Sequence, residues 1–169
     1  MANRFSILKG AKKVNKILSI AIATFMFVFA SLPAPGADRK GTAAEATAMV
    51  EKAIAHIKKA GREKAFADFS NPKGPFTDGD LYVVVYDMKG KVLAHGANAK
   101  MIDKDVIELR DSDGKFFVKE RVEMMSKGPN AKGWQDYKFM NPVSRQIEPK
   151  SMYLQRFEDV IVGCGIYKS

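Results

Sequence analysis

The sequence predicts an α+β domain in which a long N-terminal helix packs on a five-stranded antiparallel sheet with short helices. Three observations predict this class. Apolar residues recur every three or four positions over 42–60, as on one face of a helix. Two apolar runs, 81–88 and 91–96, flank a turn, and three aromatic-bearing runs follow one another over 134–167. Consecutive strands joined by short turns favour antiparallel pairing.

Residues 1–37 are expected to be a targeting segment rather than part of the domain. Residues 1–16 carry five basic residues and no acid, and residues 17–32 are almost wholly apolar. Small residues and prolines follow, in the order of a secretory signal peptide, and cleavage after Ala30 or Ala37 fits the pattern. The alternative is an uncleaved membrane anchor, although the apolar run is short of the roughly 20 residues that span a bilayer.

Most of the positive charge of the chain comes from this segment. The formal charge of +9 falls to about +4 when the five basic residues of the segment are removed. The remaining lysines alternate with acidic residues, as on a solvated surface, and we expect no nucleic-acid partner. Cys164 is the only cysteine, which excludes an internal disulfide. It lies in an apolar strand and is expected to be a small buried hydrophobe, with a reactive or dimer-forming thiol as the alternative.

The first helix has a clear start signal and a clear apolar face. Thr42 and Glu45 form the S/T-x-x-E capping box, which satisfies free backbone N–H groups at a helix start. This apolar face can pack on the sheet of the same chain, or its near-heptad seam can pair with a second copy and form a homodimer through helix 42–60. The face consists of Ala46, Met49, Val50, Ala53, Ile54, Ile57 and Ala60.

The remaining elements are short. Further helices are expected over 62–69, near 103–109 and over 115–126, separated by loops that are rich in Pro, Gly and Asp. The five strands are expected over 81–88, 91–96, 134–140, 150–157 and 160–167.

Motifs of catalysis are absent from the sequence. It contains no G-x-S-x-G, H-E-x-x-H, C-x-x-C or Walker pattern. The segment Asp111–Gly114 resembles the start of a calcium loop, but it lacks the third spaced oxygen donor and is expected to be a turn or helix cap. We therefore expect no enzyme activity, no metal and no cofactor.

Two polar residues and a group of aromatic residues are candidates for a binding pocket. His95 ends a strand before a glycine, so its imidazole either donates to a carboxylate at a pocket rim or bonds to nearby backbone. Lys150 opens an aromatic strand and is either a surface lysine or the cation that neutralises a small anion. Trp134, Tyr137 and Phe139 are either core residues or pocket walls.

Several short motifs occur together in a fixed order. They lie in FADFSNPKGPFTDGDLYVVVYDMKGKVLAHG, LRDSDGKFFVKE, GWQDYKFMNP and PKSMYLQRFEDVIVGCGIY. In this combination the sequence resembles the Cache family of extracellular sensor domains, in its single, type 2 form, over about residues 43–168. Two positions depart from the family pattern: Val160 follows Asp159 where tryptophan is frequent, and Cys164 stands where a small serine is common.

The resemblance implies a PAS-like fold, a long N-terminal helix under a curved antiparallel sheet, for a single Cache domain at 42–169. It also implies sensing outside the cytoplasm, commonly of small organic acids, and hence a periplasmic or secreted location. Because no second apolar run or kinase follows the domain in this sequence, we expect a free-standing form that signals through a separate membrane chemoreceptor or histidine kinase.

The hypothesis from the sequence is that a small carboxylate binds between the sheet and its flanking helices, where exclusion of water strengthens ion contacts. The alternative is a structural or dimerisation module whose pocket holds no ligand. The expected lining consists of Lys150 and His95 as neutralising groups, Tyr137 and Tyr153 as hydroxyl donors, and Trp134 and Phe139 as an apolar wall.

Overall fold

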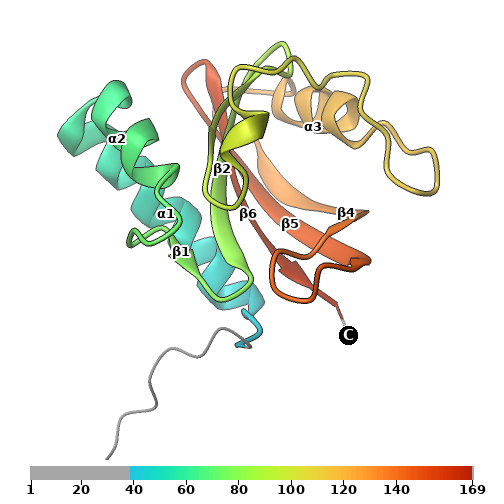
Figure 1. Ribbon diagram of the computed structural model, residues 1–169. Helices are drawn as coiled ribbons and strands as arrows, with labels where there is room; N and C mark the ends of the chain where they lie inside the picture. The colour runs from blue at the N-terminus through green and yellow to red at the C-terminus, as the bar shows by residue number, and fades with distance from the viewer. Residues whose placement is uncertain (1–38, 169) are drawn as a thin grey trace, which may run out of the picture. The chain divides into compact units, whose positions relative to one another are not determined.

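Helices cover both faces of a six-stranded antiparallel sheet. The structure is a computed structural model that describes residues 39–168, so the expected targeting segment 1–37 lies outside the described residues. Helices α1 (Ala43–Ala60) and α2 (Arg62–Phe69) lie on one face of the sheet (Figure 1). Helix α3 (Phe117–Met125) and the chain that leads to it lie on the other face. The predicted α+β class is confirmed.

The sheet contains the five predicted strands and one that was not predicted. The strand order is β1-β2-β6-β5-β4, and β3 pairs with β2 on the same side as β1. The additional strand, β1, consists of two residues that pair with the start of β2, too few to show an apolar period. The strands are β1 (Thr77–Asp78), β2 (Leu81–Asp87), β3 (Val92–His95), β4 (Lys132–Met140), β5 (Ile147–Phe157) and β6 (Val160–Tyr167).

The start of α1 is fixed by the predicted capping box. The Thr42 hydroxyl accepts from the Glu45 backbone N–H at 3.3 Å, and the Glu45 carboxylate accepts from the Thr42 N–H at 2.9 Å. The apolar face of α1 packs on the sheet of its own chain, so a homodimer through helix 42–60 would have to use the opposite face and stays a prediction. The buried residues of this face are Ala46, Val50, Ala53, Ile54 and Ile57.

The short helix predicted near 103–109 is wrong. A 3₁₀-helix, η1 (Ala99–Met101), precedes this stretch, which itself consists of turns and irregular chain with one isolated bridge from Asp105 to Lys91. Several backbone groups of this stretch bond to the β2–β3 hairpin: the Asp103 N–H donates to the Val92 carbonyl at 2.9 Å, and the Val106 N–H donates to the Gly90 carbonyl at 3.1 Å. These bonds to the β2–β3 hairpin replace the bonds that a helix would form within itself.

Alternation along the strands divides the core into two clusters. Successive side chains of a strand point to opposite faces, so β2 sends Val83 and Val85 toward α1 and Tyr82, Val84 and Tyr86 toward α3. The cluster on the α1 side is built almost wholly of aliphatic and phenyl groups. The cluster on the α3 side contains tyrosines, and this is the face that carries the polar side chains described below.

Cys164 belongs to the cluster on the α1 side. It is fully buried, and its Sγ lies 3.6 Å from the Sδ of Met49. Burial raises the pKa of the thiol to about 12, which keeps it protonated. The prediction of a small buried hydrophobe is confirmed.

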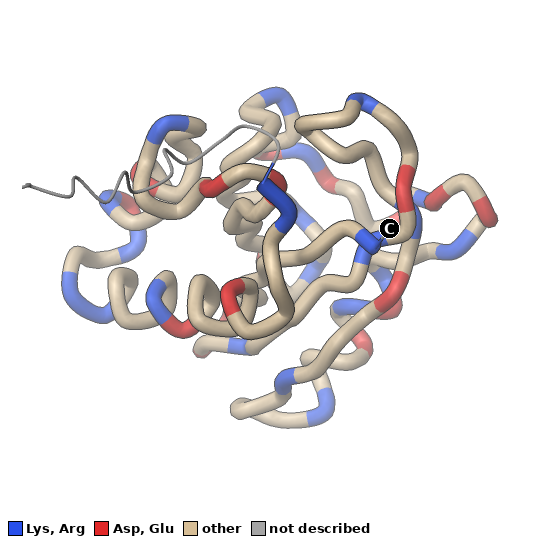
Figure 2. The backbone as a smooth tube through the Cα atoms, turned by 90° about the horizontal axis from the view of Figure 1, so that it is seen from below, with Lys and Arg blue, Asp and Glu red and all other residues tan. Residues whose placement is uncertain are grey.

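The charged residues of the described chain interleave along its surface. Lysines and arginines are interspersed with aspartates and glutamates over the described chain (Figure 2). Many of them pair, for example Arg62 with Glu158 and Asp159. Between residues 39 and 168, the structure contains no helix that is long and apolar enough to cross a membrane.

Replacing Thr42 with alanine tests the cap of α1. We expect Thr42→Ala to lower the free energy of unfolding by about 1 kcal/mol, because a backbone N–H at the helix start loses its acceptor. Urea denaturation measures this value. Thr47→Ala is the matched control, since the Thr47 hydroxyl only adds a bond to the Ala43 carbonyl inside the helix. Equal values for the two variants would show that the cap contributes nothing.

Candidate ligand-binding site

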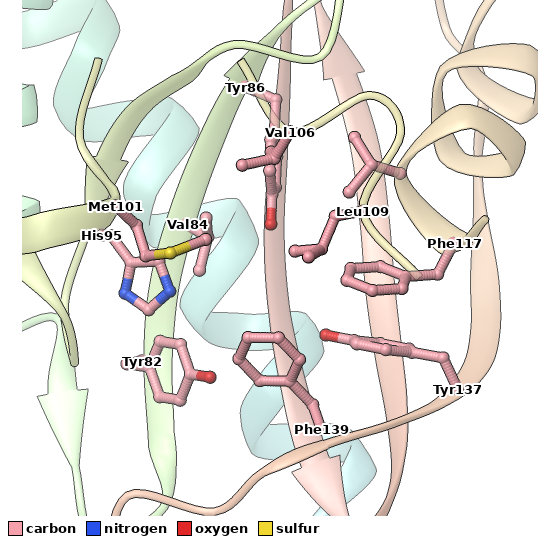
Figure 3. A pocket seen from close by; sticks show the side chains of 11 residues that line it. Tyr82, Val84, Tyr86, His95, Met101, Val106, Leu109, Phe117, Tyr137 and Phe139 are labelled. Carbon is pink, nitrogen blue, oxygen red and sulfur yellow. The ribbon is translucent and has the colours of Figure 1, made fainter. Parts of the chain in front are cut away.

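A small cavity lies between the sheet and the chain segment that carries α3. Its volume is about 10 Å³, close to the space that one water molecule occupies. The hydroxyls of Tyr82, Tyr86 and Tyr137 point toward the middle of this cavity, and His95 faces it from β3 (Figure 3). The remaining walls are apolar and consist of Val84, Met101, Val106, Leu109, Phe117, Val118 and Phe139.

Strand register places Lys150 beside this cavity. Lys150 on β5 lies opposite Tyr137 on β4 and opposite Tyr167 on β6. Its side chain has no solvent exposure. The Nζ donates to the hydroxyl oxygen of Tyr82 at 2.8 Å and to that of Tyr167 at 3.1 Å. The same nitrogen lies 4.0 Å and 4.4 Å from the centroids of these two rings, which is cation–π distance.

The ammonium of Lys150 has no carboxylate partner among the described residues. Burial lowers the pKa of Lys150 from its ordinary value to about 7, because the charged form loses its hydration. At neutral pH the side chain is therefore present in both its charged and its neutral form.

Gly165 makes room for this lysine. A Cβ at position 165 would lie 2.5 Å from the Cε of Lys150 and 3.1 Å from the Ser151 carbonyl oxygen. Because a strand carries a side chain on alternate faces, residue 165 of β6 points to the side of the sheet where Lys150 lies. Gly165 therefore contributes to the site because its missing side chain leaves room for Lys150.

His95 supplies a neutral donor rather than a positive charge. The imidazole is 4% exposed, and its Nδ1 accepts from the backbone N–H groups of Ala97 and Asn98 at 3.2 Å and 3.0 Å. Since Nδ1 accepts, the hydrogen of the neutral ring is on Nε2. Burial and the nearby Lys150 charge lower the pKa of His95 to about 3. The sequence predicted that His95 neutralises the charge of the ligand. The structure instead gives His95 an uncharged N–H that can donate a hydrogen bond to the ligand.

Arg121 is the charged residue that the sequence predictions missed, and Tyr82, Tyr86 and Tyr167 were missed with it. Arg121 projects from α3, is fully buried, and donates from Nε to the Gln135 side-chain oxygen at 3.2 Å. Its guanidinium carbon lies 4.8, 5.4 and 5.2 Å from the ring centroids of Tyr86, Phe117 and Tyr137, which all line the cavity. Both Nη atoms are buried and have no hydrogen-bond partner among residues 39–168.

The charge on Arg121 is secure. Burial by itself disfavours the charged form, but the phenolic groups of Tyr86 and Tyr137 outweigh this effect, so the pKa of Arg121 lies above its ordinary value. The site therefore contains a permanent buried cation with free donors, and an anion is the group that would satisfy them. A signal was present in the sequence: the apolar face of α3 repeats at Phe117, Val118 and Met125, and Arg121 lies on this same face.

Two of the predicted site residues lie on the opposite face of the sheet. Trp134 and Tyr153 are cross-strand neighbours whose ring centroids are 5.4 Å apart, and Tyr153 packs in the cluster on the α1 side. Trp134 is 39% exposed. Trp134 and Tyr137 are three residues apart, which puts them on opposite faces of one strand. The structure therefore brings Lys150, His95, Tyr137 and Phe139 together and separates Trp134 and Tyr153 from them.

The Asp111–Gly114 segment forms the predicted turn. One carboxylate oxygen of Asp111 accepts from the backbone N–H groups of Asp113 and Lys115 at 3.0 Å and 2.9 Å, and the other accepts from the Lys138 N–H at 3.1 Å. This carboxylate is thus used to hold the turn against β4.

Comparison with known protein families identifies the domain. The family model described as single Cache domain 2 matches residues 35–169. The chain belongs to the single Cache domain 2 family. The family is one of ligand-binding sensor modules, so the polar cavity on the α3 side of this Cache domain is its candidate ligand site.

Proteins of chemotaxis are among those similar to this Cache domain. The methyl-accepting chemotaxis protein McpP of Pseudomonas putida is 32% identical over 92 residues, which cover 53% of this chain but only 16% of McpP. A methyl-accepting chemotaxis protein of Vibrio parahaemolyticus has the same fold, with a TM-score of 0.63 and 21% identity over 73% of this chain and 86% of that one.

A second solved structure bears on ligand chemistry. It is a Cache chemosensory domain described for its recognition of carboxylic acid, with a TM-score of 0.63 and 19% identity over 75% of this chain and 92% of that one. At this level of identity the likeness shows the fold alone.

The burial of Lys150 predicts that stability rises with pH. Between pH 7 and the ordinary pKa of a lysine, the unfolded chain holds a proton that the folded chain lacks, so raising the pH favours the folded state. We compare the free energy of unfolding of wild type with that of Lys150→Met, which has no titrating group at this position. From pH 7 to 9 the free energy of unfolding of wild type should rise relative to that of the variant by about 1 kcal/mol per pH unit. Urea denaturation at each pH measures it, and parallel profiles would contradict the prediction.

Filling the space at Gly165 should disturb the site. We expect Gly165→Ala to lower the free energy of unfolding by about 1–3 kcal/mol, because the new methyl group meets Lys150 in a packed interior. Gly133→Ala is the matched control, since a Cβ there meets only the Met124 Cε at an ordinary 3.5 Å. Chemical denaturation compares the two variants, and a neutral Gly165→Ala would show that the lysine side chain moves aside freely.

Proposed function

We propose that this Cache domain is an exported sensor that binds a small carboxylate in the cavity between the sheet and α3. One observation carries the proposal: two fully buried basic side chains, Arg121 and Lys150, contact tyrosines that line the cavity, and neither has a carboxylate partner among the described residues. Buried charges in proteins are normally paired, because an unpaired charge is costly to remove from water. A bound anion would supply the missing partner.

The other groups around the cavity favour a carboxylate with a short apolar tail. The Nε2–H of His95 provides a neutral hydrogen-bond donor for a ligand oxygen, and the Tyr137 hydroxyl, which donates to the Met152 Sδ at 3.5 Å, can turn toward the ligand instead. Val84, Leu109 and Phe117 provide an apolar wall on which a methyl or ethyl group can pack. Acids of two to four carbons therefore match this combination of cations, neutral donors and apolar surface.

Binding such an acid requires the cavity to open. A volume of about 10 Å³ accommodates roughly one water molecule and no organic acid. Met101, Leu109 and Phe139 are only partly buried, unlike the rest of the lining. We propose that these three side chains move outward when the ligand enters, while the strands that carry the polar groups stay in place.

The comparisons support the role of an extracytoplasmic sensor domain in chemotaxis-type signalling. A domain of this fold was described for carboxylic acid recognition, another is a periplasmic sensor domain, and the curated relative is a methyl-accepting chemotaxis protein. We propose that residues 1–37 export or anchor the domain and that a membrane chemoreceptor or histidine kinase receives its signal.

The small size of the cavity favours a second candidate function. A domain whose pocket is filled by its own side chains can serve as a structural or dimerisation module. Light scattering on the protein separates the two functions when it is combined with the ligand screen below: a constant dimer without any ligand response favours the module, and a ligand response favours the sensor.

We expect short-chain acids to stabilise the protein in a thermal-shift screen. Acetate, propionate and butyrate should raise Tm by several degrees at millimolar concentration, because binding to the folded state alone shifts unfolding by mass action. Acetamide and propionamide have nearly the same shape without the charge, and they should raise Tm little or not at all. An equal response to acids and amides would contradict recognition of the carboxylate.

Two lysine variants complete this test. Lys150→Met should remove most of the response to acids, and its fold should persist, because methionine is apolar and of similar length. Lys132→Met replaces an exposed lysine at the start of β4 and should keep the response of the wild type. A full response in Lys150→Met would exclude Lys150 from the ligand site.

A further inference from the structure

The hydrogen bonds of Lys150 leave an ammonium one acceptor short. An ammonium has three N–H donors, and Lys150 donates to two oxygens, those of Tyr82 and Tyr167. Tyr167 gives its own hydrogen to the Met140 carbonyl at 2.7 Å. Tyr82 can direct its hydroxyl hydrogen either to Tyr167, at 3.3 Å, or to the lone pair of an uncharged Lys150. Two contacts therefore leave an ammonium with one hydrogen that has no acceptor among the described residues and with no carboxylate to offset its burial, whereas an uncharged amine has no charge to remove from water.

No charged group that faces Lys150 in the described chain forms an ion pair that would stabilise its protonated form. Asp80, in the turn before β2, favours the charged lysine, but it forms no ion pair with it within the described chain. Arg121 on α3 opposes a second positive charge. His95 on β3 is neutral, and Cys164 on β6 keeps its proton. The two tyrosine hydroxyls described above, from β2 and β6, are uncharged groups.

We propose that the pocket binds its carboxylate together with one proton, which Lys150 receives. This inference rests on the proposed function, because it concerns the same site. The ligand oxygen supplies the third acceptor and the negative charge that an ammonium needs, so the bound state favours the protonated lysine. No covalent bond of the ligand changes: a carboxylate and a proton from solvent enter, and an ammonium–carboxylate pair results.

This linkage makes acidity part of the signal. The pKa of the free lysine, lowered by burial to about 7, places the change in the physiological range. Below that pH the lysine already holds its proton, and the affinity is expected to be level. Above it the apparent dissociation constant should rise about tenfold per pH unit, because a proton must be taken up first. The domain would then report a carboxylate most strongly in neutral to acidic surroundings.

Isothermal titration calorimetry measures the number of protons that the protein takes up when the ligand binds. Acetate or propionate is titrated into the full protein at pH 8 in two buffers with different heats of ionisation, such as HEPES and Tris. The dependence of the binding enthalpy on the buffer gives the number of protons, expected to be about 0.9 at pH 8 and about 0.1 at pH 6. The small value at pH 6 also separates Lys150 from His95, whose uptake would grow as the pH falls.

Lys150→Arg is the decisive variant, because arginine stays charged throughout this pH range. If it binds propionate, it should do so without proton uptake and with a level affinity from pH 6 to 8. Uptake that persists in Lys150→Arg would assign the proton to another group and overturn the inference. If Lys150→Arg does not bind, the inference is tested by the number of protons that the wild type takes up on binding at pH 8.

The outcomes also separate this inference from the proposed function. Wild-type binding at pH 8 with proton uptake near zero would overturn the inference and leave carboxylate sensing intact. Absence of binding to acetate, propionate and butyrate at both pH 6 and pH 8 would overturn carboxylate sensing itself, and the proton linkage with it.

Discussion

The structure around the cavity depends on one constraint, the burial of two basic side chains that have no acidic partner among the described residues. Arg121 is held by aromatic faces and by the side chain of Gln135, and Lys150 is held by two hydroxyls and two tyrosine rings. These contacts lower the penalty of burial without cancelling the positive charge. The two residues respond differently, since an arginine stays charged while a buried lysine can release its proton.

The β-sheet separates this polar site from the main apolar core. Its α1 face is packed with aliphatic and phenyl groups and gives the domain a rigid base. Its α3 face carries tyrosines from β2, β4 and β6, with Lys150 between them. The segment that closes this face, residues 97–116, has little regular structure apart from η1. Rigid strands thus position the polar groups, and the less regular chain covers them.

The site also lies close to the start of α1. Asp80, two residues before Tyr82, accepts from the Gly41 backbone N–H at 2.7 Å, and Gly41 directly precedes the cap of α1. The other carboxylate oxygen of Asp80 is buried and has no partner among the described residues. The carboxylate that holds the beginning of the long helix thus also belongs to the electrostatic surroundings of Lys150.

Local patterns in the sequence determined most of the elements and part of the site. Spacing of three and four residues, the capping box and the apolar runs predicted α1, α2, α3 and five strands, because these signals depend on neighbours along the chain. They failed near 103–109, where the backbone bonds to the distant β2–β3 hairpin. The tertiary structure decided which residues share a face: register joined Lys150, His95, Tyr137 and Phe139 and set Trp134 and Tyr153 apart.

The same division explains Arg121 and the charge states. A sequence names the residues that can carry a proton, but their pKa values depend on burial and on neighbours that the fold brings from other strands and helices. Lys150 is an ordinary lysine in the sequence and a half-neutral one only inside the sheet, where Gly165, Tyr82 and Tyr167 surround it. The sequence by itself therefore determined the family and the fold, and the tertiary structure decided where the unpaired positive charge lies.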